Sequence, residues 1–146
     1  MKIVLGFGSN LGDREQYINS AYKLLEERLG ELINKSSLIE TLPWGFESKN
    51  SFINSAALFE TKATPHQALT ICNEIEKELG RVRTEQGYQN RTIDIDILFY
   101  EDITLNTPKL IIPHPLIQER DFVLTPLKEI LPNLIHPVLK KKIKDI

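Results

Sequence analysis

Residues 91–100 constrain the fold of this chain more than any other stretch. β-Branched and aromatic side chains fill the stretch, and neither glycine nor proline interrupts it, which predicts a β-strand. Side chains two residues apart on a strand point to the same face. Asp94 and Asp96 therefore share one face of the predicted strand, whereas the three isoleucines that alternate with them share the other.

The two carboxylates of Asp94 and Asp96 allow two interpretations. Held side by side on a rigid strand they repel each other, and a bound divalent cation is the simplest relief of that repulsion. Carboxylate oxygens suit magnesium, which in proteins often also binds the phosphates of a substrate. Alternatively, both side chains point into water from an exposed face of the sheet. The pair alone leaves the two interpretations open.

Three arginines lie close to this carboxylate pair in the sequence. Arg81, Arg83 and Arg91 all fall within the sixteen residues that end at Asp96. Arginines that converge with a metal ion are typical of sites that bind a polyphosphate. The alternative is that these arginines form structural ion pairs with nearby glutamates. The clustering favours the phosphate interpretation.

The composition is that of an ordinary globular protein, with 41% hydrophobic and 26% charged residues among 146. This length predicts one domain, residues 1–146. The net charge of -2 argues against a broad nucleic-acid interface, and the first apolar run is too short for a signal peptide or a membrane span. Cys72 is the only cysteine, which excludes a disulfide within the chain and fits a reducing compartment. We therefore expect a cytoplasmic single-domain protein with neither a nucleic-acid nor a membrane partner. Nothing in the sequence demands an oligomer, so we expect a monomer.

The order of the predicted elements indicates an α+β fold. Capping signals at Asp13 and Thr64 and the spacing of the apolar residues predict these elements: strand 2–8, helix 13–30, strand 32–40 centred on 36–39, strand 52–61, helix 64–80, strand 91–100, a short strand in 101–105 and a helix near 127–131. This order predicts a ferredoxin-like βαββαβ sandwich with additional short strands and a C-terminal helical segment. We expect helices on one face of the sheet and the chemistry on the other.

Several side chains outside the carboxylate strand are candidates for binding a ligand. Phe52 and Asn54 share a face of their strand, and a ring beside an amide suits a flat, hydrogen-bonding heterocycle. A core phenylalanine beside an asparagine that bonds nearby backbone is the alternative. His114 stands between two prolines, which fix the backbone around it. Together with Arg120 it is a candidate hydrogen-bond donor to a phosphate group. Trp44, in a loop, either packs on the core or closes over a ligand.

Five segments together carry a resemblance to a known family. They are Gly8–Gly12, Phe52–Asn54, Gly80–Arg83, Arg91–Leu98 and Pro113–Pro115. In this order and spacing the sequence closely resembles the hydroxymethyl-dihydropterin pyrophosphokinases of folate biosynthesis, over almost the whole chain. The resemblance implies a ferredoxin-like α+β fold. It also implies an enzyme that transfers a pyrophosphoryl group from ATP to the 6-hydroxymethyl group of 7,8-dihydropterin and releases AMP.

The same resemblance implies roles for individual residues. Asp94 and Asp96 would bind two Mg²⁺ ions that bridge the phosphates of the co-substrate ATP, and Arg81 and Arg91 would join them in catalysis. The pterin would contact Thr41, Leu42, Trp44, Gly45, Phe52, Asn54, Tyr88 and Phe122. ATP would contact Glu76, Arg83, Lys109, Ile111, His114 and Arg120.

The loop before the carboxylate strand departs from the family pattern. Family members often have Arg-Trp-Gly-Pro where this chain has Gly-Tyr-Gln-Asn. An arginine is therefore missing at Gly87, whereas Tyr88 keeps an aromatic ring that can cover the pterin. The resemblance implies that this loop closes over both substrates together with residues 10–13 and the loop around Trp44. Such closure would exclude water, the competing nucleophile.

Two rival functions remain open from the sequence. A ferredoxin-like binding module for a small molecule or RNA would share the fold, although the acidic balance of the chain weakens RNA binding. A relative that binds pterin or nucleotide without turnover would share the five segments, although the intact pair of Asp94 and Asp96 argues against it. Detection of AMP from ATP, hydroxymethyldihydropterin and magnesium separates these functions.

Overall fold

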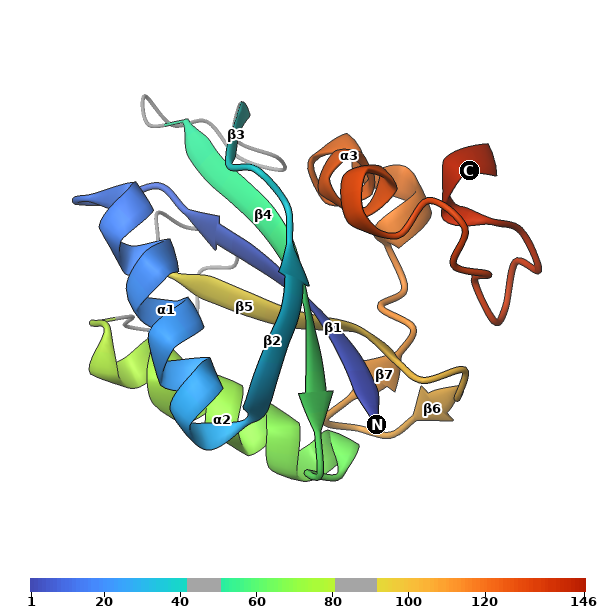
Figure 1. The fold of residues 1–146 in the computed structure, drawn as a ribbon, viewed down its shortest axis with the longest axis horizontal. Helices are drawn as coiled ribbons and strands as arrows, with labels where there is room; N and C mark the ends of the chain where they lie inside the picture. The colour runs from blue at the N-terminus through green and yellow to red at the C-terminus, as the bar shows by residue number, and fades with distance from the viewer. Residues whose placement is uncertain (42–50, 81–91) are drawn as a thin grey trace.

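The computed structural model describes residues 1–41, 51–80 and 92–146, in which the elements follow the predicted order (Figure 1). They are β1 (Lys2–Ser9), α1 (Arg14–Arg28), β2 (Gly30–Lys35), β3 (Ile39–Thr41), β4 (Phe52–Thr61), α2 (Pro65–Glu78), β5 (Asp94–Tyr100), β6 (Leu105–Asn106), β7 (Ile111–Ile112) and α3 (Asp121–Ile130). Short 3₁₀ turns at Ile117–Glu119 and Ile143–Asp145 precede and follow α3. No helix in this described part is long and apolar enough to cross a membrane.

Strand β1 lies inside the main antiparallel sheet, paired with β4 on one side and β5 on the other. The strand order is β2–β4–β1–β5, and β3 pairs with the first three residues of β4, Phe52–Asn54. Helices α1 and α2 cover one face of this sheet, whereas α3 lies on the other side, where it packs against β4 (Figure 1). The predicted ferredoxin-like α+β sandwich is confirmed. The predicted additional short strands are present as β6 and β7, which form a separate two-stranded sheet.

Both predicted helix starts carry the predicted caps. The Asp13 carboxylate accepts the backbone N–H of Gln16 at 3.2 Å, which satisfies one of the free donors at the start of α1. At α2 the Thr64 hydroxyl accepts from Gln67 N at 3.2 Å, and the Gln67 side chain accepts from Thr64 N at 2.9 Å. This reciprocal pair is a capping box, so local sequence is sufficient to set both starts.

The predicted strand over 32–40 is wrong at its centre. Residues 36–38 form the break between β2 and β3 rather than the middle of one strand. The hydroxyl of Ser36 accepts the N–H of Ala56 at 2.9 Å, so a side chain replaces the backbone acceptor and the regular ladder stops. Ser37 N then donates to Glu129 of α3 at 2.7 Å. The break therefore ties the edge of the sheet to the C-terminal helix.

Helix α3 begins earlier than the sequence predicted. Residues 121–124, expected to be a connection into a helix near 127–131, already form its first turn. Leu124 and Leu127 lie one turn apart and are both buried against the sheet face that carries Leu58 and Leu98. Burial of this apolar stripe favours the longer helix over local propensity.

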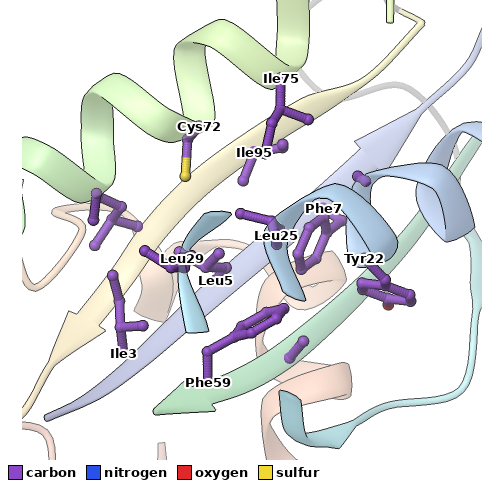
Figure 2. Close-up of a cluster of buried hydrophobic side chains, with 14 of the residues drawn as sticks. Ile3, Leu5, Phe7, Tyr22, Leu25, Leu29, Phe59, Cys72, Ile75 and Ile95 are labelled. Atoms are coloured by element: carbon purple, nitrogen blue, oxygen red, sulfur yellow. The ribbon is translucent and has the colours of Figure 1, made fainter. Parts of the chain in front are cut away.

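The main core fills the space between the sheet and the helices α1 and α2 (Figure 2). Ile3, Leu5 and Phe7 of β1 point into it because they alternate along the strand. They meet residues from α1, α2, β4 and β5, among them Tyr22, Leu25, Phe59, Cys72, Ile75 and Ile95. Cys72 is fully buried there, and burial raises the pKa of its thiol. The one cysteine is thus a core residue.

The C-terminal segment packs back onto the opposite face of the sheet. Ile143 is fully buried beside Val4 and Phe99. His136 organises the turn before it, because its Nδ1 accepts the N–H groups of Val138 and Leu139 at 3.2 and 3.1 Å. Burial lowers the pKa of this imidazole. The basic residues near the end of the chain are exposed, but the backbone that carries them is anchored.

Gly30 gives a test of how tightly β2 joins β4. A Cβ atom on Gly30 would lie 1.9 Å from the carbonyl oxygen of Glu60. We expect Gly30→Ala to lower the free energy of unfolding by about 1–3 kcal/mol, since the two backbones must move apart. Urea denaturation followed by circular dichroism measures the change. Glu31→Ala, at an exposed neighbouring position, should stay within about 0.5 kcal/mol of wild type, and equal stability of both variants would contradict the packing.

Candidate active site

The register of three strands brings the predicted site residues into one row. Gly8 on β1 pairs with Asp94 on β5 and with Asn54 on β4. Directly paired residues of an antiparallel sheet point to the same face. The carboxylate and the amide therefore flank Gly8, whose missing side chain leaves a hollow between them. Gly6 pairs with Asp96 in the next row and also lines the space above the sheet, where the side chain of Leu98 lies 3.2 Å from the position of a Cβ atom on Gly6.

A cavity, here named the central cavity, opens over these two glycines. Phe52 enters it from the first residue of β4, and Phe122 enters from the first turn of α3. Its lining is Gly6, Phe7, Gly8, Thr41, Phe52, Asn54, Ser55, Asp94, Asp96, Leu98, Arg120, Phe122 and Val123. Two aromatic rings, an amide and two carboxylates around one hollow suit a flat polar ring with a reactive group near the carboxylates.

A second cavity, the edge cavity, lies along the outer edge of β5. The segment that carries β7 forms its other wall. Its lining is Leu69, Asn73, Asp94, Ile95, Asp96, Ile97, Thr107, Pro108, Lys109, Leu110, Ile111, His114, Pro115 and Arg120. Asp94, Asp96 and Arg120 line both cavities. Two ligands, one in each cavity, would therefore meet at the carboxylate pair.

His114 is held with a defined tautomer at the edge cavity. Its backbone N–H donates to the carbonyl of Leu98 at 3.0 Å, and its Nδ1 accepts from Leu116 N at 3.2 Å. The proton of the neutral ring is therefore on Nε2. Burial and the positive charge of Arg120 lower the pKa of His114, against the opposing effect of Asp94. His114 is thus a neutral donor near pH 7.

Arg120 connects the two cavities. Its side chain is 7% exposed, and its guanidinium carbon lies 5.7 Å from the centre of the Phe122 ring. This cation–π contact holds the guanidinium beside the ring at the wall that the two cavities share. Its backbone is extended just before α3 begins, and its side chain lines both cavities.

Glu76 occupies a different place from the predicted ATP contacts. It is 2% exposed on α2, and its Oε2 accepts the N–H of Ile95 at 2.8 Å. Ile95 lies between the two aspartates, and β5 is the last strand of the main sheet, so this carboxylate supplies an acceptor at an open strand edge. Neither cavity lining, as far as the chain is described, includes Glu76. Its contact with ATP stays a prediction.

Comparisons with known proteins agree with this geometry. A sequence model of the 7,8-dihydro-6-hydroxymethylpterin-pyrophosphokinase family matches residues 4–132. The chain belongs to this family. It is 42% identical over 143 residues to the 2-amino-4-hydroxy-6-hydroxymethyldihydropteridine pyrophosphokinase of Aquifex aeolicus, covering 98% of this chain and 88% of that one. It is 41% identical over 138 residues to the protein of the same name from Porphyromonas gingivalis, covering 92% and 93%.

Solved structures of pyrophosphokinase domains share the fold. In their names, HPPK stands for 7,8-dihydro-6-hydroxymethylpterin-pyrophosphokinase. A crystal structure of HPPK-DHPS in complex with substrates superposes with a TM-score of 0.83 at 18% identity, over 99% of this chain. The wild-type HPPK-DHPS of Plasmodium falciparum superposes with a TM-score of 0.80 at 20% identity, also over 99%. This chain spans only 42% and 43% of those two longer chains. At such identities the likeness supports the pyrophosphokinase fold alone.

The donor set at the shared wall fits magnesium in a member of this pyrophosphokinase family. Asp94 and Asp96 are half-buried and separated by one buried residue, so both carboxylates face the cavities. Within residues 1–41, 51–80 and 92–146, no group of three or more histidine, cysteine or acidic side chains is arranged to enclose a metal. Magnesium usually binds one or two carboxylates and takes its other ligands from water and substrate phosphates.

Apart from Glu76, the structure brings together at the two cavities those predicted pyrophosphokinase site residues that it describes. Thr41, Phe52, Asn54 and Phe122 line the central cavity, and Lys109, Ile111 and His114 line the edge cavity. The other predicted site residues, Leu42, Trp44, Gly45, Arg81, Arg83, Tyr88 and Arg91, lie outside the described residues. Their roles stay predictions.

Sequence reasoning missed Gly6 and the floor role of Gly8. Both glycines were predicted to lie in the strand 2–8, but not to line a binding cavity; they belong to β1 and line the central cavity. The available signal was two glycines at alternate positions within an apolar strand. Glycine inside a strand often marks the close approach of a ligand or another backbone.

The charge of Arg120 gives a pH test of the shared wall. Because its positive charge lowers the pKa of His114, we expect Arg120→Gln to raise that pKa towards its ordinary value of 6.5. Titration of the His114 ring by NMR measures the shift. Arg28→Gln, which removes an exposed arginine paired with Glu78, should leave it unchanged.

The same titration predicts the direction of a stability change. The folded-state pKa of His114 lies below its unfolded value, so folding favours the neutral ring. The stability from this group is present above pH 6.5 and is lost as the pH falls through the folded-state pKa.

An unchanged or lower pKa of His114 in Arg120→Gln would contradict the proposed proximity of the two charges.

Proposed function

We propose that this protein transfers the pyrophosphoryl group of ATP to the 6-hydroxymethyl group of 6-hydroxymethyl-7,8-dihydropterin, giving the pterin diphosphate and AMP in folate biosynthesis. The observation that carries the proposal is the pair of cavities that share Asp94, Asp96 and Arg120. A transfer between two bound substrates requires two adjacent sites with the reacting groups at their boundary. Membership of the pyrophosphokinase family supports the same reaction.

The pterin would bind in the central cavity. Phe52 and Phe122 offer aromatic faces, and Asn54 offers hydrogen bonds at the edge of the ring. The glycines of β1 leave room for a flat ring above the sheet. With the ring held by these contacts, its hydroxymethyl oxygen would point towards the carboxylates of Asp94 and Asp96. Leu42, Trp44, Gly45 and Tyr88 would complete this pocket, as the family resemblance implies.

ATP would bind in the edge cavity, with its phosphates towards the carboxylates. Lys109 and Ile111 line the side away from them, and His114 and Arg120 line the side next to them. A neutral His114 donates from Nε2 to a phosphate oxygen, and the guanidinium of Arg120 binds phosphate through its planar donors. Arg81, Arg83 and Arg91 would add positive charge to the same triphosphate. These contacts would hold the β-phosphorus in line with the pterin oxygen.

Asp94 and Asp96 would hold two Mg²⁺ ions together with the phosphates. When bound, magnesium would neutralise phosphate charge and act as a Lewis acid towards the transferring group. The contribution of this chain is to present both carboxylates from one rigid strand. The N–H of Ile95 bonded to Glu76 fixes the backbone between them. The loop closure that the family resemblance implies would exclude water from the reacting groups.

We further propose that residues 1–146 act as one monomeric domain in the cytoplasm. The buried cysteine needs no oxidising environment, and the described helices and sheets share continuous cores. Size-exclusion chromatography with light scattering measures the oligomeric state.

The carboxylate pair can be tested by removing one charge without changing its shape. We expect Asp96→Asn to lower magnesium-dependent AMP formation by roughly 100-fold or more. The variant should remain folded, since it also removes the repulsion between the two aspartates. A coupled AMP assay and thermal unfolding measure both quantities. Asp102→Asn, at an exposed position after β5, should keep full activity, and full activity of Asp96→Asn would refute the metal assignment.

The stacking role of Phe122 can be tested by substrate. Removing the ring should weaken binding of the pterin about tenfold and leave the affinity for ATP within about twofold. Isothermal titration of Phe122→Ala with each ligand measures the difference. Phe122→Tyr keeps the ring and should keep pterin affinity. Equal losses for both ligands in Phe122→Ala would contradict stacking on the pterin.

A further inference from the structure

The amide of Asn54 is held at both ends inside the central cavity. The hydroxyl of Thr41, at the end of β3, donates to Asn54 Oδ1 at 2.6 Å. At the other end Asn54 Nδ2 donates to the carbonyl oxygen of Phe7 at 3.4 Å. Asn54 is 6% exposed, so these partners replace nearly all of its contact with water.

These two partners define which way the amide points. A backbone carbonyl oxygen is only an acceptor, so the end of the amide beside Phe7 must be the nitrogen. The oxygen then faces Thr41, and the hydroxyl must act as the donor. If the two ends were exchanged, Oδ1 would face the Phe7 carbonyl oxygen, where neither atom can donate. Nδ2 would then face the hydroxyl of Thr41. The Thr41 bond is the shorter of the two and therefore the main restraint.

The floor of the cavity leaves space for this orientation. Asn54 Nδ2 lies 3.1 Å from the position that a Cβ atom on Gly8 would occupy. The nitrogen therefore sits over the glycine floor, beside the space for a ligand. One amide hydrogen faces Phe7, and among the described residues the second has no protein partner. This second hydrogen is available to an acceptor atom on a bound ring.

We infer that Thr41 is a positioning residue that sets the substrate specificity of the central cavity through Asn54. By fixing Oδ1, the Thr41 hydroxyl presents the Nδ2 hydrogen to the ligand. The site then favours a ring that carries a carbonyl oxygen at this edge over the same ring with an amino group there. An amino group would bring two donors together and leave both without an acceptor. The inference rests on the proposed function, because it takes the ligand to be a pterin.

The first experiment measures specificity directly. We compare binding of 6-hydroxymethylpterin, which has a 4-oxo group, with that of its 4-amino counterpart by isothermal titration without ATP. Wild type should prefer the 4-oxo ring. Thr41→Val keeps the shape and removes the hydroxyl, so its affinity for the 4-oxo ring should fall about five- to tenfold. Its preference over the 4-amino ring should shrink, because only the long 3.4 Å bond to the Phe7 carbonyl then opposes a turn of the amide oxygen towards the ligand.

Two matched variants separate the hydroxyl from other effects. Thr41→Ser keeps the donor and should retain the wild-type preference. Thr70→Val makes the same exchange at an exposed position on α2 and should change neither affinity. Thermal unfolding of each variant identifies any loss of folded protein. A preference in Thr41→Val equal to that of wild type would overturn the inference.

A second measurement needs no ligand. In ligand-free wild type the Asn54 side-chain amide should give one ordered pair of signals in ¹⁵N NMR. Thr41→Val should broaden or shift them, whereas Thr41→Ser should not. Unchanged signals in Thr41→Val would mean that the hydroxyl does not position the amide, and would overturn the inference even if pterin affinity fell through a direct contact.

The two experiments also distinguish this inference from the proposed function. If wild type binds neither ring, the proposed function fails. If wild type binds the 4-oxo ring and forms AMP, but Thr41→Val behaves like wild type, only the role of Thr41 fails. The NMR result bears on the hydrogen bond itself in either case.

Discussion

The antiparallel pairing of β1 with both β4 and β5 is the constraint on which the rest of the structure depends. It aligns Asp94, Gly8 and Asn54 across three strands, and Asp96 with Gly6 in the next row. Because paired residues share a face, a shift of the register by one residue would turn every one of these side chains into the helix-side core. The apolar alternation of Ile3, Leu5 and Phe7 prevents such a shift. The packing that stabilises the fold therefore also sets the geometry of the site.

The two faces of the sheet divide stability and function. The helix-side face carries the main apolar core, which α1 and α2 cover (Figure 2). On the other face, α3 covers only the part where Leu58 and Leu98 present side chains. The glycines of β1 leave the neighbouring part hollow, and the start of α3 brings Arg120 and Phe122 to its rim. The helix α3 thus lines the cavity with its first turn and closes the second core together with Ile117 and Ile143.

Much of the site could be predicted from the sequence, because its residues lie on regular elements. Alternation along β5 placed both aspartates on one face, and alternation along β4 placed Phe52 beside Asn54. The family of the chain was also predictable from five short segments and is confirmed. The position of Glu76 could not be predicted in this way. Its buried carboxylate accepts the N–H of Ile95 on β5. Nothing local in α2 indicates which backbone group a buried glutamate will meet.

The sequence by itself determined the order of elements, both helix caps and the faces of the strands, since these depend on neighbours in the chain. Tertiary structure alone decided the break at residues 36–38, where Ser36 bonds Ala56 on another strand. It also decided the first turn of α3, which forms because Leu124 finds an apolar sheet face. The hydrogen bond from Thr41 to Asn54 joins residues of two strands across thirteen positions. Such contacts depend on register and packing, which no local pattern contains.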